Sequence, residues 1–199
     1  MAANECFLDS ATLRENVVSL ARNIGYVPRS RRSARAKVSF NVSGLTETST
    51  LTLNSGVVCN GAGDNTNYIF CIPEDITVPV TNGFAEFNNI EIYEGVFVSE
   101  NFTVDTSLFN QRYILDNSFI DTSTIKVKVK SSSTATSSVT YKQIDNIVGV
   151  TSTSNSYLLQ EIEDERYELI FGDNVIGRKL SNNNYITASY IVTDGKDGN

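Results

Sequence analysis

From residue 38 to residue 192, short runs of alternating apolar and polar residues are separated by Gly, Asn and Asp, which is the pattern of half-buried β-strands joined by turns. The clearest run extends from Ile125 to Lys130, where three apolar residues alternate with three lysines. The turn signals recur at the spacing of roughly 8–12 residues that is typical of sandwiches and barrels. We expect strands over residues 38–43, 51–53, 56–58, 68–70, 76–78, 84–87, 90–93, 96–98, 102–104, 113–115, 125–130, 139–141, 157–161, 167–171 and 185–192.

The last three runs predict a small antiparallel meander whose tightest turn follows Phe171. Phe171 is expected to enter a core, and Gly172 can take a backbone angle that larger residues avoid. The side chains of Asp173 and Asn174 can close the turn through hydrogen bonds to the backbone. We therefore treat Gly172, Asp173 and Asn174 as a candidate structural turn, although an ordinary surface hairpin shows the same pattern.

A different periodicity marks the N-terminal part of the chain. Over residues 4–26, large apolar residues recur at intervals of three and four, as they do on one face of an α-helix. Gly25 and the following Pro28 give the usual signal for the end of a helix. This face has two candidate partners, which are the sheet of the same chain and the helices of another chain in a bundle. The candidate helix interface consists of Leu13, Val17, Leu20 and Ile24.

These patterns divide the chain into four parts. Residues 1–27 hold the helix, and residues 28–37 are a basic linker without an apolar face. Residues 38–115 are a first β region, and residues 116–199 are a second one that ends in the meander. The expected fold class is mainly β with one N-terminal α-helix (α+β). Its body would be an antiparallel β-sandwich or a partly closed barrel, built as one unit or as two β subdomains.

The composition is that of a globular chain, with 199 residues of which 40% are hydrophobic and 20% charged. No apolar run approaches the length of about 20 residues that crosses a bilayer. The N-terminus lacks the basic and then apolar pattern of a secretory signal. We therefore expect neither secretion nor a membrane partner.

The net charge of −7 is unevenly distributed. Residues 1–40 carry seven basic and three acidic side chains, a net charge of +4, which leaves −11 for the rest of the chain. An acidic body disfavours nucleic acid as a partner. The basic cluster at residues 29–37 is too short to change this, and we interpret it as a solvated linker or as a contact to an acidic neighbour.

The residue types that carry most enzyme chemistry are scarce. Histidine is absent, which removes the commonest general base and the commonest metal ligand. Cys6, Cys59 and Cys71 lack the spacing of a metal site, and we expect free thiols, with a Cys59–Cys71 disulfide as the alternative. The carboxylates of residues 161–165 are typical of a solvated turn. We expect no enzyme activity, no catalytic residues, no cofactor, no metal and no small-molecule substrate.

Seven segments carry a resemblance to a known family, because they occur together in one order and spacing. They are residues 3–11, 16–28, 110–113 (NQRY), 120–124 (IDTST), 157–161 (YLLQE), 171–178 (FGDNVIGR) and 190–195 (YIVTDG). The chain resembles the baseplate wedge proteins of T-even-like contractile-tailed bacteriophages, which are related to the wider baseplate J-like family. The resemblance covers most of the chain and is weakest over residues 44–100.

The sequence departs from the family pattern at two turns. Where the family usually has Phe-Gly-Asp-Gly, this chain has Asn174, and Asn tolerates the left-handed conformation that the turn needs. Three consecutive asparagines at residues 182–184 replace a Gly-Asn pair before the last strand. Both departures keep residues that favour turns.

The resemblance implies a structural role in a virion. Family members dimerise with themselves and join other wedge subunits through helices, and the wedges close a ring whose change of shape helps to trigger sheath contraction. For this chain the resemblance implies other wedge subunits as partners, including a second copy of itself in the full-length protein. It also implies a location in the tail baseplate, after assembly in the bacterial host cytoplasm. Because family members are considerably longer, we expect the sequence to be a fragment.

A second function remains open on the sequence alone. A β-rich chain of this kind can also be a host-adhesion or carbohydrate-binding module of a phage tail. Such a module would favour exposed aromatic residues, above all Trp, and the sequence contains no Trp.

Overall fold

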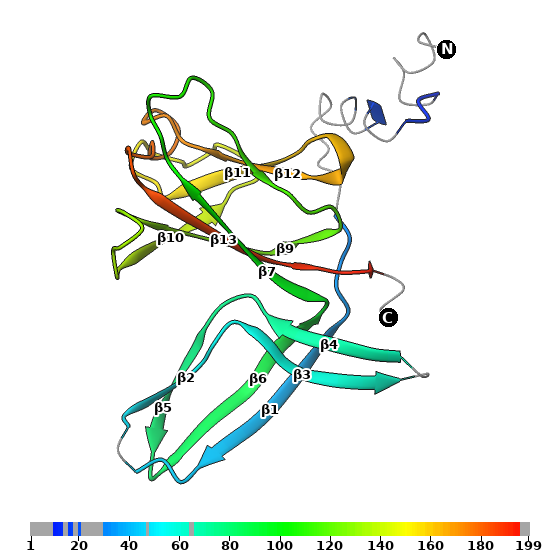
Figure 1. Cartoon of the computed structure of the whole chain (residues 1–199), viewed down its shortest axis with the longest axis vertical. Helices are drawn as coiled ribbons and strands as arrows, with labels where there is room; N and C mark the ends of the chain where they lie inside the picture. Colours follow the sequence, from blue (N-terminus) through cyan, green and yellow to red (C-terminus); the bar gives the residue numbers. More distant parts are fainter. Residues whose placement is uncertain are drawn as a thin grey trace.

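The computed structural model describes residues 10–13, 16, 17, 20, 30–46, 48–63 and 66–195. In these residues thirteen β-strands form two sheets, and a 3-10 turn, η2 (Glu163–Glu165), joins two of the strands. Figure 1 shows the two sheets one above the other, with the first sheet below and the second above.

The first sheet has six strands and is built around its longest one. In chain order the strands are β1 (Arg35–Ser43), β2 (Thr50–Leu53), β3 (Gly56–Gly63), β4 (Thr66–Ile72), β5 (Ile76–Thr81) and β6 (Phe84–Glu94). Their spatial order is β2-β5-β6-β4-β3, and β1 pairs with β6 outside this path. The core of the sheet is small, because most of its apolar side chains are only partly buried. The fully buried ones are Ile72, Ala85, Phe87, Ile90 and Ile92.

The second sheet has seven strands. They are β7 (Val96–Thr103), β8 (Tyr113–Leu115), β9 (Ile120–Lys130), β10 (Ser138–Gln143), β11 (Ser156–Glu161), β12 (Tyr167–Phe171) and β13 (Tyr185–Val192). Their spatial order is β7-β13-β9-β10-β11-β12-β8. Every neighbouring pair is antiparallel except β10 and β11, which are parallel over a short register.

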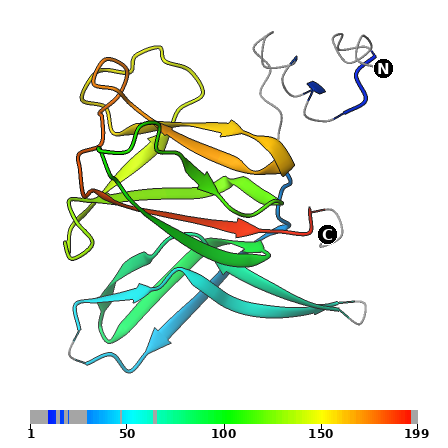
Figure 2. The same cartoon turned by 45° about the horizontal axis from the view of Figure 1, so that its top comes forward.

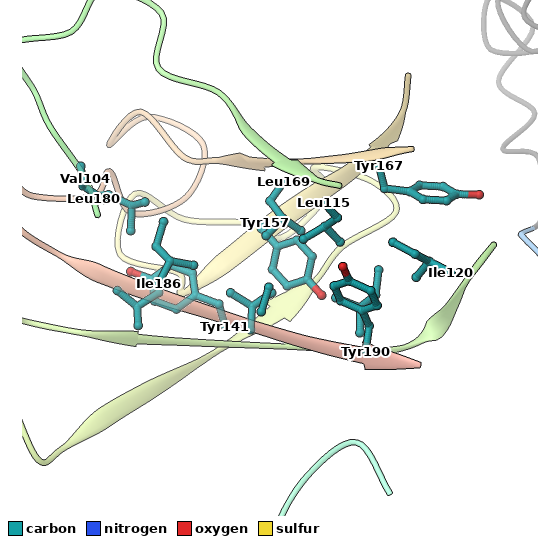
Figure 3. Packing of buried hydrophobic residues seen from close by; sticks show 14 residues of the cluster. Val104, Leu115, Ile120, Tyr141, Tyr157, Tyr167, Leu169, Leu180, Ile186 and Tyr190 are labelled. Carbon is teal, nitrogen blue, oxygen red and sulfur yellow. The ribbon is translucent and has the colours of Figure 1, made fainter. Parts of the chain in front are cut away.

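This second sheet curls around a core of its own side chains. Figure 3 shows Tyr141, Tyr157 and Tyr190, from β10, β11 and β13, pointing into one interior together with Leu115 and Leu169. The ring of Phe171, at the end of β12, packs at the edge of this core. Its centroid lies 5.5 Å from that of Tyr113, 5.6 Å from that of Tyr141 and 6.2 Å from that of Tyr157. Aromatic pairs of this geometry each add about 0.5–1.5 kcal/mol beyond the burial of their area.

Side chains close the gap between β7 and β8, the two ends of the seven-stranded sheet. Within the described strands no backbone ladder joins β7 to β8. Instead, the Glu100 carboxylate of β7 accepts hydrogen bonds from the Tyr190 hydroxyl, from the Asp116 amide (3.1 Å) and from the Asn117 side-chain amide (3.3 Å). The Asn117 amide also donates to the Tyr190 hydroxyl oxygen at 2.8 Å. The rings of Phe102 on β7 and Tyr113 on β8 also meet across the gap, with centroids 5.8 Å apart. The sheet is therefore a barrel whose last seam is held by side chains, with the Glu100 carboxylate as its main polar link.

Close backbone packing fixes the passage from the first sheet to the second. The chain crosses at Gly95, whose φ of +132° and close neighbours exclude a side chain, since a Cβ there would lie 2.3 Å from the Val192 carbonyl oxygen. Next to it, the buried Glu94 carboxylate accepts a hydrogen bond of 2.7 Å from the Thr193 hydroxyl. A buried carboxylate needs such partners, because it is costly to remove a charge from water.

The basic segment before β1 crosses the same junction. The fully buried Asp121 of β9 accepts a hydrogen bond of 2.9 Å from the Ser33 amide, and the Arg35 guanidinium lies 3.8 Å from the same carboxylate. Arg31 stacks on the ring of Phe119, 3.8 Å from its centroid. The sequence allowed this basic segment to be a solvated linker or a contact to an acidic neighbour. Its described part contacts an acidic residue, which is Asp121 of the same chain.

The predicted α+β fold class is wrong. The regular elements of the described residues are the thirteen strands and the 3-10 turn, so the class is all-β, and the second sheet fits the expected partly closed barrel. The predicted helix over residues 4–26 lies mostly outside the described residues. An amphipathic period shows only that a helix would have an apolar face, whereas its stability comes mainly from packing. Among the described residues, no side chain before Val38 belongs to either core.

The predicted strands are confirmed in position, but the predicted meander of the last three runs is wrong. β11 and β12 pair with each other, whereas β13 pairs with β7 and β9 at the other end of the sheet. Residues 84–87 and 90–93 form the single strand β6, and residues 96–98 and 102–104 fall on or next to the single strand β7. The change of sheet falls at Gly95. Residues 96–115, which the sequence pattern grouped with the first β region, thus pair within the second sheet.

We expect the variant Tyr190→Phe to lower the free energy of unfolding by about 1–3 kcal/mol, because it removes the hydrogen bond that the buried hydroxyl donates to Glu100 and the one that it accepts from Asn117. Tyr185→Phe is the matched control on the same strand, since no hydrogen bond of its hydroxyl is recorded among the described residues, and it should change stability by no more than about 0.5 kcal/mol. Urea unfolding followed by circular dichroism measures both. Equal effects of the two variants would contradict the role of the Tyr190 hydroxyl.

Candidate interaction surface

The turn after β12 is closed by the side chain of Asp173. Its Oδ1 accepts hydrogen bonds of 2.9 Å from the backbone amides of both Val175 and Ile176. The hydrogen bond from the Ile176 amide, followed in size of effect by that from the Val175 amide, stabilises the charged carboxylate. These bonds hold the pKa of Asp173 below its usual range. The two residues that donate them are therefore fixed with their apolar side chains at the tip of the turn.

Asn174 and Gly172 complete the same turn. Asn174 has a φ of +73°, and its backbone amide donates to the Gly177 carbonyl at 2.9 Å. Its side-chain oxygen accepts a hydrogen bond of 2.9 Å from the Lys179 amide. Gly172 is needed for space, since a Cβ there would lie 2.2 Å from the Gly177 carbonyl carbon. The structure thus brings Gly172, Asp173 and Asn174 together in one tight turn.

This turn belongs to the longest of three neighbouring loops, and that loop contacts both of the others. The loops comprise residues 104–112, 144–155 and 172–184, and Figures 1 and 2 show them gathered at one end of the second sheet. Loop 172–184 lies between the other two and donates backbone hydrogen bonds to both. These bonds run from the Gly177 amide to Thr151 O (3.1 Å), from Arg178 to Ser154 O (2.9 Å) and from Asn183 to Val104 O (2.8 Å).

Apolar side chains point into solvent from the tips of all three loops. Phe109 is 93% exposed, Val148 is 85% exposed and Val175 is 73% exposed. Single exposed apolar residues are normal, but several on adjacent loops form a surface that favours contact with another protein. We call this set the apolar loop surface. It consists of Leu108, Phe109, Ile147, Val148, Val175 and Ile176.

A groove beside the second sheet does not have the lining of a sugar site. It has a volume of about 710 Å³ and lies beside β9 and β10. Its aromatic lining residues are Tyr141 and Tyr157, which are 6% and 2% exposed, so neither ring offers a face for a sugar to stack on. Lys126 in its wall is paired with Glu74 at 3.0 Å.

The predicted helix interface is described only in part. Leu13 is 52% exposed, and its carbonyl accepts hydrogen bonds of 3.1 Å from the amides of Asn16 and Val17. Val17 and Leu20 are half-buried, and Ile24 lies outside the described residues.

Two other kinds of site are absent from the described part of the chain. No group of three or more His, Cys, Asp or Glu side chains there is arranged to hold a metal ion. No helix in that part of the chain is long and apolar enough to cross a membrane. Cys59 and Cys71 are both free thiols, as expected, and the Cys59–Cys71 disulfide is not formed.

Sequence reasoning found the turn but missed the surface around it. Phe109 and Val148 lie in segments rich in Asn, Asp and Gly, where no apolar period draws attention to them. The signal that could have found them is the occurrence of large apolar residues within predicted loops, which are solvent-exposed by default.

The comparison with known proteins gives one informative match. No protein-family model matches the chain. The chain is 24% identical over 216 aligned residues to the baseplate wedge protein gp6 of Enterobacteria phage T4. The alignment includes the whole of this chain, but the chain spans only 32% of the length of that relative. The similarity indicates a distant relation to a phage baseplate protein, which supports the resemblance seen in the sequence at this coarser level.

We expect Gly172→Ala to lower the free energy of unfolding by about 1–3 kcal/mol, because its methyl group would displace the backbone at Gly177. Gly149→Ala is the comparison variant, since it also adds a methyl group to a loop glycine but has no atom within 4 Å of the new Cβ. It should cost less, and only through its positive φ. Thermal unfolding measures both, and a larger loss at Gly149 would contradict the steric argument.

The pH dependence of the turn follows from Asp173. Because its pKa is lowered in the folded chain, the turn is fully stabilised above the ordinary value of 3.8 and loses that stabilisation as the pH falls through the lowered pKa. We expect the amide proton signals of Val175 and Ile176 to shift together in an NMR titration, with a midpoint below 3.8. The joint shift should vanish in Asp173→Asn, and a midpoint above 3.8 would refute the assignment.

Proposed function

We propose that the chain is a structural component of the baseplate of a contractile phage tail, a wedge subunit that works by contact with neighbouring subunits. The observation that carries the proposal is the apolar loop surface, combined with the similarity along the whole chain to a phage baseplate wedge protein. Six apolar side chains on loops that are fixed to one another are suited to a partner surface that removes them from water.

The loops are held rigidly enough for such a contact. Their backbones are joined by hydrogen bonds, and the turn at Asp173 and Asn174 is closed by side chains. A surface that is already ordered loses little conformational entropy when it binds. The curled sheet below the loops acts as the scaffold that holds them at one end.

We propose that the partners are other baseplate wedge subunits, including a second copy of this chain in the full-length protein. The location that follows is the tail baseplate of the virion, reached by assembly in the cytoplasm of the bacterial host. In this proposal the wedges form a ring whose rearrangement controls contraction of the sheath. The membership in the wider baseplate J-like family belongs to the same proposal.

We propose further that the chain catalyses no reaction and needs no cofactor. The absence of histidine from the sequence leaves few groups for general acid–base work near neutral pH. The alternative function, a host-adhesion or carbohydrate-binding module, has less support, because Tyr141 and Tyr157 in the groove beside β9 and β10 are buried and offer no face on which a sugar could stack.

The apolar loop surface can be tested with the double variant Phe109→Asp/Val148→Asp. Burial of each such side chain contributes about 1.5–3 kcal/mol, so we expect incorporation of the tagged chain into tail particles to fall at least about tenfold. Incorporation is measured by quantitative mass spectrometry of tails purified from infected cells. The single variant Val96→Asp is the matched control, because Val96 is 57% exposed but lies on β7 at the junction of the sheets. Unchanged incorporation of the double variant, with its fold intact, would contradict this role of the surface.

A glycan array separates the two functions. The baseplate proposal predicts no specific binding, whereas saturable binding of one class of glycan, lost on substitution in the groove beside β9, would favour adhesion as the main function.

A further inference from the structure

We propose that the outer face of β9 is a docking surface for an extended acidic segment of another polypeptide. The surface is formed by Lys126, Lys128 and Lys130, which we call the lysine row. This inference goes beyond the apolar loop surface, because it concerns a different face of the second sheet and a charged rather than an apolar contact.

The three lysines of the row lie on the outer side of the curled sheet. They alternate along β9 with Ile125, Val127 and Val129, which are buried in the core. Alternate residues of a strand share one face and lie about 6.5–7 Å apart. The strand therefore presents three positive side chains at a regular spacing.

The neighbouring strands surround the row with polar side chains. Thr187 of β13 and Thr140 of β10 stand opposite Lys128 on its two sides. The carboxylates of β7, β9, β10 and β13 are used elsewhere, Glu100 at the seam and Asp121 at the junction of the sheets. These four strands therefore leave positive charge on their shared outer face.

Protection of a sheet edge does not account for the row. Lysines often stand on edge strands, where they block pairing with another chain. β9 is an inner strand, because it pairs with β13 on one side and with β10 on the other. The chain as a whole is acidic, with a net charge of −7. Three lysines aligned on an inner strand of such a chain are suited to a partner of complementary charge.

The chain itself shows which chemistry the row accepts. The turn between β4 and β5 lies against the outer face of β9 and β13, as Figure 1 shows. The Glu74 carboxylate of this turn lies 3.0 Å from the Lys126 ammonium. The pKa of Asp75 is lowered, first by the hydrogen bond from the Ser55 amide and to a lesser extent by the positive charge of Lys128. An acidic turn thus occupies one end of the row.

The other end of the row is open. Within the described residues Lys128 and Lys130 form no salt bridge, and both are half-buried. A half-buried lysine packs its stem against its neighbours and keeps its ammonium in water. An extended segment with carboxylates on alternate residues matches the row, since its side chains on one face repeat at the same distance of about 6.5–7 Å.

A long polyanion such as nucleic acid suits the surface less well. It would extend past the row and meet the rest of an acidic chain, which repels it. The row consists of lysines, without the planar arginine fork that binds a phosphate through two hydrogen bonds. A short acidic segment covers the row without reaching beyond it, and we therefore assign the surface to a polypeptide.

Binding can be measured with a defined probe, a peptide of about eight residues that alternates Glu and Thr and has blocked ends. We expect it to shift the amide signals of β9 and its neighbours in an NMR titration, with a Kd of about 1 mM that rises with salt. Lys128→Gln/Lys130→Gln should weaken binding about three- to tenfold, because two exposed ion pairs are lost. Lys37→Gln/Lys179→Gln is the matched control, since it removes the same charge from exposed lysines elsewhere, and it should change Kd by no more than about twofold.

Two results of this titration would overturn the proposal. Equal weakening by the two double variants would mean that net charge alone explains the binding. Tighter binding of a single-stranded DNA oligonucleotide, or of vesicles that contain anionic lipid, at the same residues would make the row a general surface for polyanions.

Purified tails give a second test, and only this one rests on the proposed function. A carbodiimide joins a lysine amine directly to a carboxylate in contact with it, so the Lys126–Glu74 pair should be linked and serves as the internal reference. We expect Lys128 or Lys130 to be linked to an Asp or Glu of another polypeptide, as identified by mass spectrometry. Formation of the reference link without any such link would overturn the proposal. Absence of the chain from tails would instead contradict the baseplate proposal, and the peptide titration would still decide this one.

Discussion

Glu100 holds together the two ends of a sheet that has no backbone ladder between them. The seven-stranded sheet must curl to cover its own core, yet β8 has only three residues and pairs with β12 alone. The carboxylate of Glu100 on β7 gathers the Asp116 amide, the Asn117 side chain and the hydroxyl of Tyr190, a residue that is fully buried. Charge-assisted hydrogen bonds are about twice as strong as neutral ones, and this suits them to a seam that the backbone does not close.

The closed seam determines where the three exposed loops lie. Loop 104–112 connects β7 to β8 across the seam, and loop 172–184 contacts it through Val104 and Asn183. If the seam opened, β8 and the loop before it would lose their position relative to β13. The seam therefore keeps the apolar loop surface ordered at one end of the sheet.

The sequence was sufficient for the parts of the fold that depend on local pattern. Strict alternation placed β9, a run of β-branched and aromatic residues placed β13, and the chemistry of Gly, Asp and Asn placed the turn at residues 172–174, because these signals act within a few residues. It was insufficient where distant residues decide. The change of sheet at Gly95 depends on the close approach of Val192, almost a hundred residues later, and the seam depends on Glu100 meeting Tyr190. The α+β class failed for the same reason, since an apolar helical stripe does not specify what it packs against.

The most direct test of this account is amide hydrogen exchange, residue by residue, in the wild-type chain and in Glu100→Ala. If the Glu100 carboxylate is the polar link on which the seam depends, the amides of β7 and β8 should exchange faster in the variant, while those in the β9–β13 ladder keep their rates. Uniform acceleration across all strands of the second sheet, or no change at β8, would contradict the claim that this sheet is closed by side chains at a single seam.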